Sequence, residues 1–203
     1  MNAAGKYDRI YSREDPFGRK PERIVEDTLQ FKNSGRVLDL GAGQGRNSVF
    51  LLEKGFKVTA VDLSSVGIGK IRGDALKRHL PIKAKIGNAV NVGFSNPYDV
   101  VLLLFVLHHL QDDEAKALIN KAKSGTARDG LNIIAAFTRI GDFYEVNPNS
   151  GRFYPEPGQL KGIYSDWEIL KWYERTTTAY QKFKSGRPMR NKTSFLIARK
   201  SNV

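Results

Sequence analysis

The sequence contains no cysteine among its 203 residues. This absence excludes disulfides, thiolate metal ligands and a cysteine nucleophile. No run of eighteen apolar residues occurs either, so a membrane-spanning helix is not expected. The first residues, 1–9, lack the apolar stretch of a secretory signal. We therefore expect a cytoplasmic protein that does not associate with membranes and whose chemistry needs no metal ion.

Acidic residues are scarce relative to basic ones, because 33 Lys and Arg stand against 21 Asp and Glu and give a formal net charge of +12. Such an excess attracts nucleic acid or anionic small molecules. The basic residues are spread along the chain, so an ordinary solvated surface explains the charge equally well. Charge alone leaves a nucleic-acid partner and a small-molecule partner open, and the sequence indicates no oligomeric state.

The most informative stretch is an apolar run that breaks into alternating glycines, VLDLGAGQGRN over residues 37–47. A short buried strand that ends in glycines and continues with helical spacing predicts a strand, a tight turn and a helix. Glycines allow positive φ and a close approach of a ligand to the backbone. Ligands of an open α/β sheet lie at the carboxyl ends of its strands, so we expect a cofactor site here. A turn without a ligand is the alternative.

The spacing of the glycines distinguishes between cofactors. A dinucleotide-binding loop has its third glycine three positions after the second, where this sequence has Arg46. A Walker-type phosphate loop is excluded because no Gly-Lys-Ser/Thr closes the stretch. Instead, Asp39 precedes glycines at positions 41, 43 and 45. This D-x-G-x-G-x-G pattern resembles motif I of the class I S-adenosylmethionine-dependent methyltransferases.

A second carboxylate follows at the end of the next predicted strand, over residues 57–62. Asp62 ends this strand, and Ser64 is a suitable N-cap for the helix that comes next. A carboxylate at this place can accept hydrogen bonds from both hydroxyls of a ribose. The position matches the second motif of the resembled family, although sites for NAD share it. Asp62 therefore supports an adenosine-containing ligand, and the glycine spacing favours S-adenosylmethionine as the cofactor.

The resemblance implies further contacts with this cofactor. Asn88 follows a predicted strand over residues 82–86 and is expected at the adenine amino group. Phe105 ends a predicted fourth strand and is expected near the methionine end of the cofactor. Tyr7 and Tyr11 are candidates for an amino-terminal lid, with surface aromatics packed on the first helix as the alternative. The full set of expected cofactor-binding residues is Asp39, Gly41, Ala42, Gly43, Asn47, Asp62, Leu63, Asn88, Ala89, Phe105, Tyr7 and Tyr11.

No catalytic residue follows from the sequence. His108 and His109 are candidates for a general base because imidazole titrates near neutral pH, and a structural role at a helix start is the alternative. A long aromatic loop over residues 141–155 follows a predicted fifth strand over residues 131–137. We expect it to cover the acceptor and exclude water, unless it is an irregular surface loop. Positive charge near an anionic acceptor can come from Arg46, Arg139, Arg152, Arg187 and Arg190.

Other segments narrow the resemblance to the tellurite-resistance-type branch of the family, namely residues 45–48, 157–168 and 195–200. The chain has Tyr180-Gln181-Lys182 where that branch has a polar His-Arg pair, so tellurite is not indicated as the acceptor. The resemblance implies a Rossmann-like α/β fold with a seven-stranded sheet of order 3-2-1-4-5-7-6, an antiparallel strand 7 and helices on both faces. We expect one domain over residues 1–203, with a lid and helix over 1–33, a cofactor-binding core over 36–138, and an acceptor-side loop with carboxyl-terminal strands over 139–203.

We therefore expect an enzyme that transfers a methyl group from S-adenosylmethionine directly and in line to a small acceptor. Anionic and chalcogen-containing molecules are the candidates for this acceptor. An RNA methyltransferase is the main alternative because of the net charge of +12. A non-catalytic cofactor-binding module and a nicotinamide oxidoreductase are further alternatives. The sequence identifies neither the acceptor nor its reacting atom.

Overall fold

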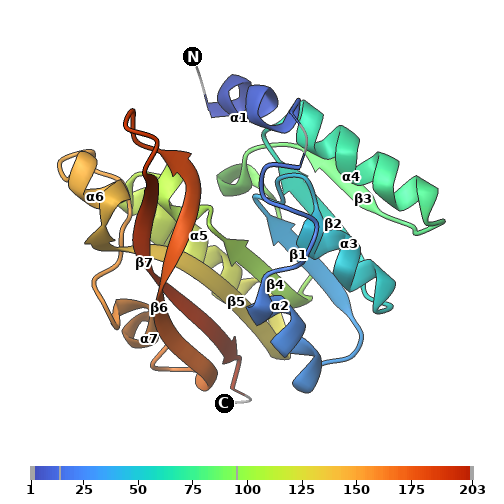
Figure 1. Ribbon diagram of the computed structural model, residues 1–203. Coiled ribbons are helices and arrows are strands. Elements are labelled where there is room, and N and C mark those ends of the chain that lie inside the picture. Colours follow the sequence, from blue (N-terminus) through green and yellow to red (C-terminus); the bar gives the residue numbers. More distant parts are fainter. Residues whose placement is uncertain (1–2, 14, 95, 202–203) are drawn as a thin grey trace.

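The computed structural model describes residues 3–13, 15–94 and 96–201, and strands alternate with helices through most of it (Figure 1). Residues 1, 2, 14, 95, 202 and 203, which fall in the predicted domain ranges, lie outside the described residues. The strands are β1 (Arg36–Leu40), β2 (Lys57–Asp62), β3 (Lys83–Ile86), β4 (Tyr98–Leu104), β5 (Thr126–Gly141), β6 (Glu168–Lys182) and β7 (Pro188–Arg199).

The strands form one mixed sheet of order β3-β2-β1-β4-β5-β7-β6. Strands β1 to β5 pair in parallel, and β7 runs antiparallel to both β5 and β6. The predicted strand order and the antiparallel seventh strand are confirmed. In β1, residues 37–40 are buried, as expected for a parallel strand that is covered on both faces.

Helices cover both faces of this sheet, as predicted. The bounds of the helices are α1 (Ala3–Tyr11), α2 (Arg23–Asp27), α3 (Arg46–Glu53), α4 (Ser65–Lys77), α5 (Asp112–Ser124), α6 (Asp142–Val146) and α7 (Gln159–Ile163), with 3₁₀ turns η1 (Thr28–Gln30), η2 (Ala89–Asn91) and η3 (Leu107–His109). Alternate residues of β1 enter opposite cores: Val37 packs with α2 and α3, whereas Leu38 and Leu40 pack with α5 and α7. Among the described residues, no helix has the length and apolar composition needed to cross a membrane.

Two predicted segments differ in the structure. The loop expected from residue 141 contains helix α6, and β5 extends beyond the predicted end at residue 137 to Gly141. Strand β7 causes this extension, because Gly141 still pairs with Asn191. Fourth-strand pairing ends at Leu104 rather than at Phe105, whose φ of +55° departs from strand geometry. A pairing partner from a distant part of the chain decides the end of β5, and the backbone conformation of Phe105 decides the end of β4.

Candidate cofactor and acceptor site

A cavity of about 670 Å³ lies at the carboxyl ends of β1, β2 and β4. Its walls come from the glycine loop after β1, the end of β2, the turns after β3 and β4, the amino-terminal segment and strand β6. Small-molecule sites have volumes of about 300–1,000 Å³. Every predicted cofactor-binding residue except Asp39 lines this cavity, namely Gly41, Ala42, Gly43, Asn47, Asp62, Leu63, Asn88, Ala89, Phe105, Tyr7 and Tyr11.

The glycine loop allows other groups to approach its backbone closely. Gly41 and Gly43 have φ values of +79° and +60°, which side-chain-bearing residues rarely adopt. A Cβ atom on Gly41 would lie 2.8 Å from Cγ2 of Val106, and one on Gly43 would lie 2.8 Å from the hydroxyl oxygen of Tyr11. The loop therefore needs glycine for its conformation and for the space above its backbone.

Asp39 lies behind the glycine loop and does not line the cavity. Its side chain is buried, and its carboxylate accepts a hydrogen bond of 2.7 Å from Oγ of Ser48 in α3. Burial raises the pKa of Asp39 to about 6, and the charge of Asp62 adds to the shift. We expected Asp39 to face the cofactor, but strand alternation places it with Val37 on the face that α3 covers. In this structure Asp39 joins β1 to α3 beneath the loop.

Asp62 fixes the end of β2 against the glycine loop. Its Oδ2 accepts a hydrogen bond of 2.8 Å from the backbone N–H of Gly43, and its Oδ1 accepts one of 2.8 Å from the backbone N–H of Ser64. Burial raises the pKa of Asp62 above its ordinary value, although the two N–H donors oppose the shift. A carboxylate has about four acceptor positions. Both oxygens of Asp62 thus retain capacity for donors from a ligand such as a ribose diol.

Two asparagines on the cavity wall are held by backbone groups. Oδ1 of Asn88 accepts a hydrogen bond of 3.2 Å from the N–H of Val90 and caps η2. Oδ1 of Asn47 accepts one of 2.9 Å from the N–H of Glu22, which ties the segment before α2 to α3. Both side chains are thereby oriented before any ligand binds, and Oδ1 of Asn88 keeps a second lone pair for a donor such as the adenine amino group.

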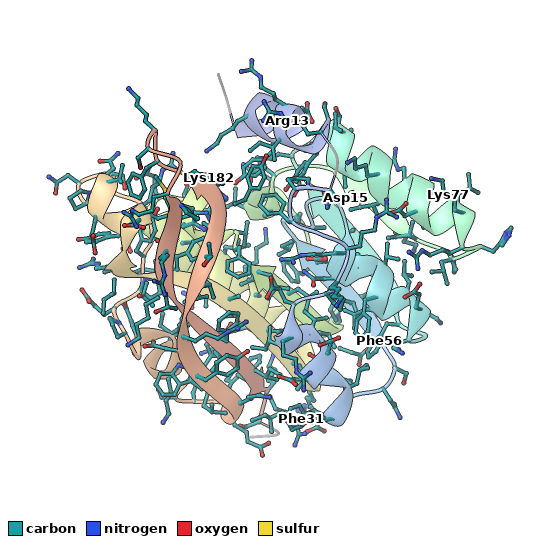
Figure 2. All side chains as sticks on the ribbon, viewed as in Figure 1. Arg13, Asp15, Phe31, Phe56, Lys77 and Lys182 are labelled. Carbon is teal, nitrogen blue, oxygen red and sulfur yellow. The ribbon has the colours of Figure 1, made fainter. Side chains whose placement is uncertain are left out.

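Aromatic side chains of the amino-terminal segment cover one side of the cavity. The rings of Tyr7 and Tyr11 are 5.5 Å apart, that of Phe17 is 6.0 Å from Tyr11, and Phe17 reaches Tyr180 of β6 at 5.4 Å. In Figure 2, Arg13 after α1 and Lys182 at the end of β6 mark the same edge of the sheet. Asp8 anchors this segment to the start of α4, because its carboxylate accepts a 2.5 Å hydrogen bond from Oγ of Ser64. The predicted lid position of Tyr7 and Tyr11 agrees with this arrangement.

The two candidate histidines lie side by side on the wall, with ring centroids 3.9 Å apart. Burial lowers the pKa of His108 well below its usual value and, with a contribution from the positive charge of Lys6, lowers that of His109 to about 4. Both imidazoles are therefore neutral near pH 7. Nε2 of His109 lies 2.9 Å from the Tyr7 hydroxyl, whereas the buried Nδ1 of His108 has no hydrogen-bond partner among the described residues.

Parts of the wall were not predicted from the sequence, namely Phe137, Glu22, Gln44 and the β6 residues 175–181. Phe143 also lines the cavity and belongs to the segment that we expected to cover the acceptor. Of the five candidate arginines, Arg46 alone lines the cavity, and it is paired with Glu22. Arg139 and Arg187 form ion pairs elsewhere, with Glu156 and Asp142.

The model of a family described as tellurite resistance protein TehB matches residues 17–196. The chain belongs to the TehB family. It is 28% identical over 193 residues to a probable S-adenosyl-L-methionine-dependent methyltransferase TehB of Haemophilus influenzae, a match that covers 93% of this chain and 67% of that protein. It is also 28% identical over 176 residues to hemagglutinin 1 of Eikenella corrodens, covering 87% of this chain and 58% of that one. The chain thus spans between 58% and 67% of the length of these relatives.

Solved structures agree with the TehB assignment. The crystal structure of TehB from Haemophilus influenzae has a TM-score of 0.79 at 25% identity, over 98% of this chain and 67% of that chain. The N-methyltransferase NodS from Bradyrhizobium japonicum, in complex with S-adenosyl-l-homocysteine, has a TM-score of 0.77 at 13% identity, over 98% and 99% of the two chains. NodS shows similarity of fold alone. The predicted family and its class I methyltransferase fold are confirmed.

Within the TehB fold, the chain departs from the expected pattern at the cavity itself. Tyr180 and Gln181 line the cavity from β6, in the segment where the resemblance to the tellurite-resistance-type branch implies a His-Arg pair. Tyr180 also contacts the amino-terminal segment through Phe17. The departure therefore alters the wall of the candidate site and is not confined to the exposed surface.

Proposed function

We propose that this TehB-family protein is an S-adenosylmethionine-dependent methyltransferase that acts on a small acceptor held in the same cavity. One observation carries the proposal: Gly41, Asp62, Asn88 and Phe105 come from the ends of four different strands and line one cavity. The Haemophilus relative is a probable S-adenosyl-L-methionine-dependent methyltransferase, and NodS was solved with S-adenosyl-l-homocysteine, so both support the same cofactor.

The residues of the cavity fit this cofactor. Gly41 and Gly43 line the cavity with bare backbone that the amino-acid part can approach. Asp62 offers charged acceptors to the ribose hydroxyls, and Asn88 offers its side-chain oxygen to the adenine amino group. S-adenosylmethionine supplies, when bound, a methyl group made electrophilic by a sulfonium sulfur. The task of the protein is then to hold the acceptor in line and to keep water out. Correct orientation lowers such a barrier by about 7–11 kcal/mol.

The histidines bear on which acceptors suit the site. An effective general base has a pKa near the working pH, whereas the pKa of His109 is about 4 and that of His108 is also well below its ordinary value. Neither imidazole is a strong base near pH 7. We therefore propose an acceptor that arrives with its lone pair available, such as an anionic or chalcogen-containing group, and assign His108 and His109 to positioning.

The cover formed by Tyr7, Tyr11 and Phe17 favours a small acceptor over RNA, because these rings enclose the cavity from the amino-terminal side. The net charge of +12 is the observation that favours the RNA alternative. Tight RNA binding with a steep dependence on salt concentration would support that alternative. Weak RNA binding that does not depend on the sequence or structure of the RNA would count against an RNA methyltransferase.

Calorimetry with S-adenosylhomocysteine and an assay with methyl-labelled S-adenosylmethionine test the proposal together. We expect binding of S-adenosylhomocysteine, and transfer of label to components of a small-molecule extract but not to RNA. Absence of S-adenosylhomocysteine binding would refute the cofactor assignment. Binding without transfer to any acceptor would instead indicate a non-catalytic module, and tight binding of NADH would indicate an oxidoreductase.

A further inference from the structure

Most charged groups on the cavity wall already have partners. Arg46 is paired with Glu22, and the carboxylate of Asp62 accepts two backbone N–H groups. Oε2 of Glu114 accepts a hydrogen bond of 3.0 Å from the N–H of Gln111. Both histidines on the wall are neutral near pH 7. The lining residues thus leave one cationic side chain to be explained.

That side chain is Arg175 of β6. No carboxylate of the described residues forms an ion pair with it, and its guanidinium makes no hydrogen bond to any of them. Its guanidinium carbon instead lies 5.2 Å from the ring centroid of Phe195, on which Tyr173 also stacks at 4.9 Å. Contact with a ring face restrains a guanidinium while its five N–H groups remain available. Arg175 is exposed to solvent, and its guanidinium is restrained by the ring and has no acceptor among the described residues.

Aromatic rings continue from this guanidinium along the cavity. Phe195 lies 6.2 Å from Phe105, Phe105 lies 5.0 Å from Phe137, and Phe137 meets Phe143 edge-on at 4.8 Å. Phe105, Phe137 and Phe143 line the cavity itself. Rings at these separations form favourable aromatic contacts and offer an apolar, planar surface to a ligand.

Neighbouring contacts hold the last of these rings in place. The backbone N–H of Phe143 donates a 2.8 Å hydrogen bond to Oδ1 of Asn191 in β7. Asp142, the residue before it, pairs with Arg187 and accepts a 2.7 Å hydrogen bond from the N–H of Arg190. The start of α6 is therefore fixed to β7, and the aromatic wall is built before a ligand arrives.

We propose that the acceptor is a small aromatic acid, whose carboxylate binds Arg175 and whose ring packs against Phe105, Phe137 and Phe143. The inference rests on the proposed function of the same cavity and specifies its substrate class. A planar guanidinium matches a carboxylate with two parallel charge-assisted hydrogen bonds, which explains arginine at this place. The rings supply the apolar contacts that a small ligand needs in addition to one ionic group.

The test measures affinity without turnover, by calorimetry on protein saturated with S-adenosylhomocysteine. The probes are benzoate, 4-hydroxybenzoate, 4-mercaptobenzoate and indole-3-acetate, each compared with its uncharged amide. We expect at least one acid to bind tenfold or more tightly than its amide. In Arg175→Gln the acid and its amide should bind with about equal affinity, while the affinity for S-adenosylhomocysteine changes by less than twofold.

Arg190→Gln is the matched control, because it removes the same charge from the neighbouring strand, where Arg190 is the register partner of Thr178 and does not line the cavity. It should retain the preference for acids, and thermal unfolding should show both variants folded.

Failure of every acid to bind better than its amide would overturn the inference, as would equal losses of this preference in Arg175→Gln and Arg190→Gln. Weaker S-adenosylhomocysteine binding in Arg175→Gln would also overturn it, by assigning Arg175 to the carboxylate of the cofactor. Absence of S-adenosylhomocysteine binding to the wild type would instead refute the proposed function.

Discussion

The hydroxyl of Tyr7 lies 2.9 Å from Nε2 of His109, a residue 102 positions further along the chain. The two rings also meet edge-on, with centroids 5.3 Å apart. Burial raises the pKa of Tyr7 to about 12 and lowers that of His109 to about 4, so both groups are neutral near pH 7. A neutral hydrogen bond thus connects α1 to the turn after β4 beside the cavity.

Removing this hydrogen bond should loosen the amino-terminal cover without unfolding the protein. Tyr7→Phe keeps the ring contacts and removes the hydroxyl, whose net contribution is about 0.5–1.5 kcal/mol. We expect faster proteolysis within residues 3–11 and an affinity for S-adenosylhomocysteine that falls by up to about tenfold, as measured by calorimetry. Unchanged proteolysis together with unchanged affinity would show that Tyr7 is not part of a cover.

The carboxylate of Asp62 should be required for cofactor binding. Hydrogen bonds to a charged group contribute about 1.5–3 kcal/mol each, so loss of two of them from the ribose weakens binding by roughly a hundredfold or more. Asp62→Ala should show this loss in calorimetry with S-adenosylhomocysteine. Asp62→Asn keeps one oxygen acceptor for the glycine loop and should lose less. Wild-type affinity in both variants would remove the basis for the cofactor site.

Gly43 and Gly55 allow the backbone cost of a glycine to be separated from the space it provides. Both have positive φ, +60° and +88°, so alanine at either position costs about 1–3 kcal/mol of backbone strain. A Cβ on Gly43 meets the Tyr11 hydroxyl at 2.8 Å, whereas one on Gly55 meets nothing within 4 Å.

We therefore expect Gly43→Ala to lower the free energy of unfolding by more than Gly55→Ala in urea titrations, because its Cβ must also displace the Tyr11 hydroxyl. Only Gly43→Ala should also weaken binding of S-adenosylhomocysteine, because Gly43 lines the cavity. Equal affinities in the two variants would show that the space above the loop does not matter for the ligand.

The sequence predicted the cofactor side of the site better than the acceptor side, for a physical reason. Gly41, Asp62 and Asn88 directly follow strands of a parallel sheet, so strand order alone brings them to one edge. Asp39 was wrongly expected to face the cavity, because the glycine motif does not reveal which face α3 covers. Asp39 and Val37 are alternate residues of β1 and therefore share a face, and Val37 packs in the core that α3 covers.

The acceptor side depends on contacts between distant segments. Residues 175–181 reach the cavity because β6 pairs with β7, and the register of this pairing shifts between Thr178 and Lys182. Phe137 and Phe143 meet because β5 extends to Gly141 along β7. No local pattern in the sequence specifies a register shift or a bend in a hairpin, so the place of Arg175 on the cavity wall had no signal.

Asp39 should make the stability of the protein depend on pH. Its pKa rises from 3.8 when unfolded to about 6 when folded, chiefly through burial. The folded state then binds more protons than the unfolded state between these values, so the free energy of unfolding falls as pH rises through this interval. A shift of about two units corresponds to roughly 3 kcal/mol, present at low pH and lost above the folded pKa.

Asp39→Asn isolates this contribution. The amide oxygen can still accept the hydrogen bond from Ser48, but the side chain no longer ionises. Urea titrations between pH 4 and pH 8 should show the unfolding free energy of the variant rising relative to wild type as pH increases, because ionisation of the buried carboxyl destabilises only the wild type. Parallel pH profiles for the two proteins would show that the Asp39 carboxyl titrates in the folded protein as it does in the unfolded chain, despite its burial.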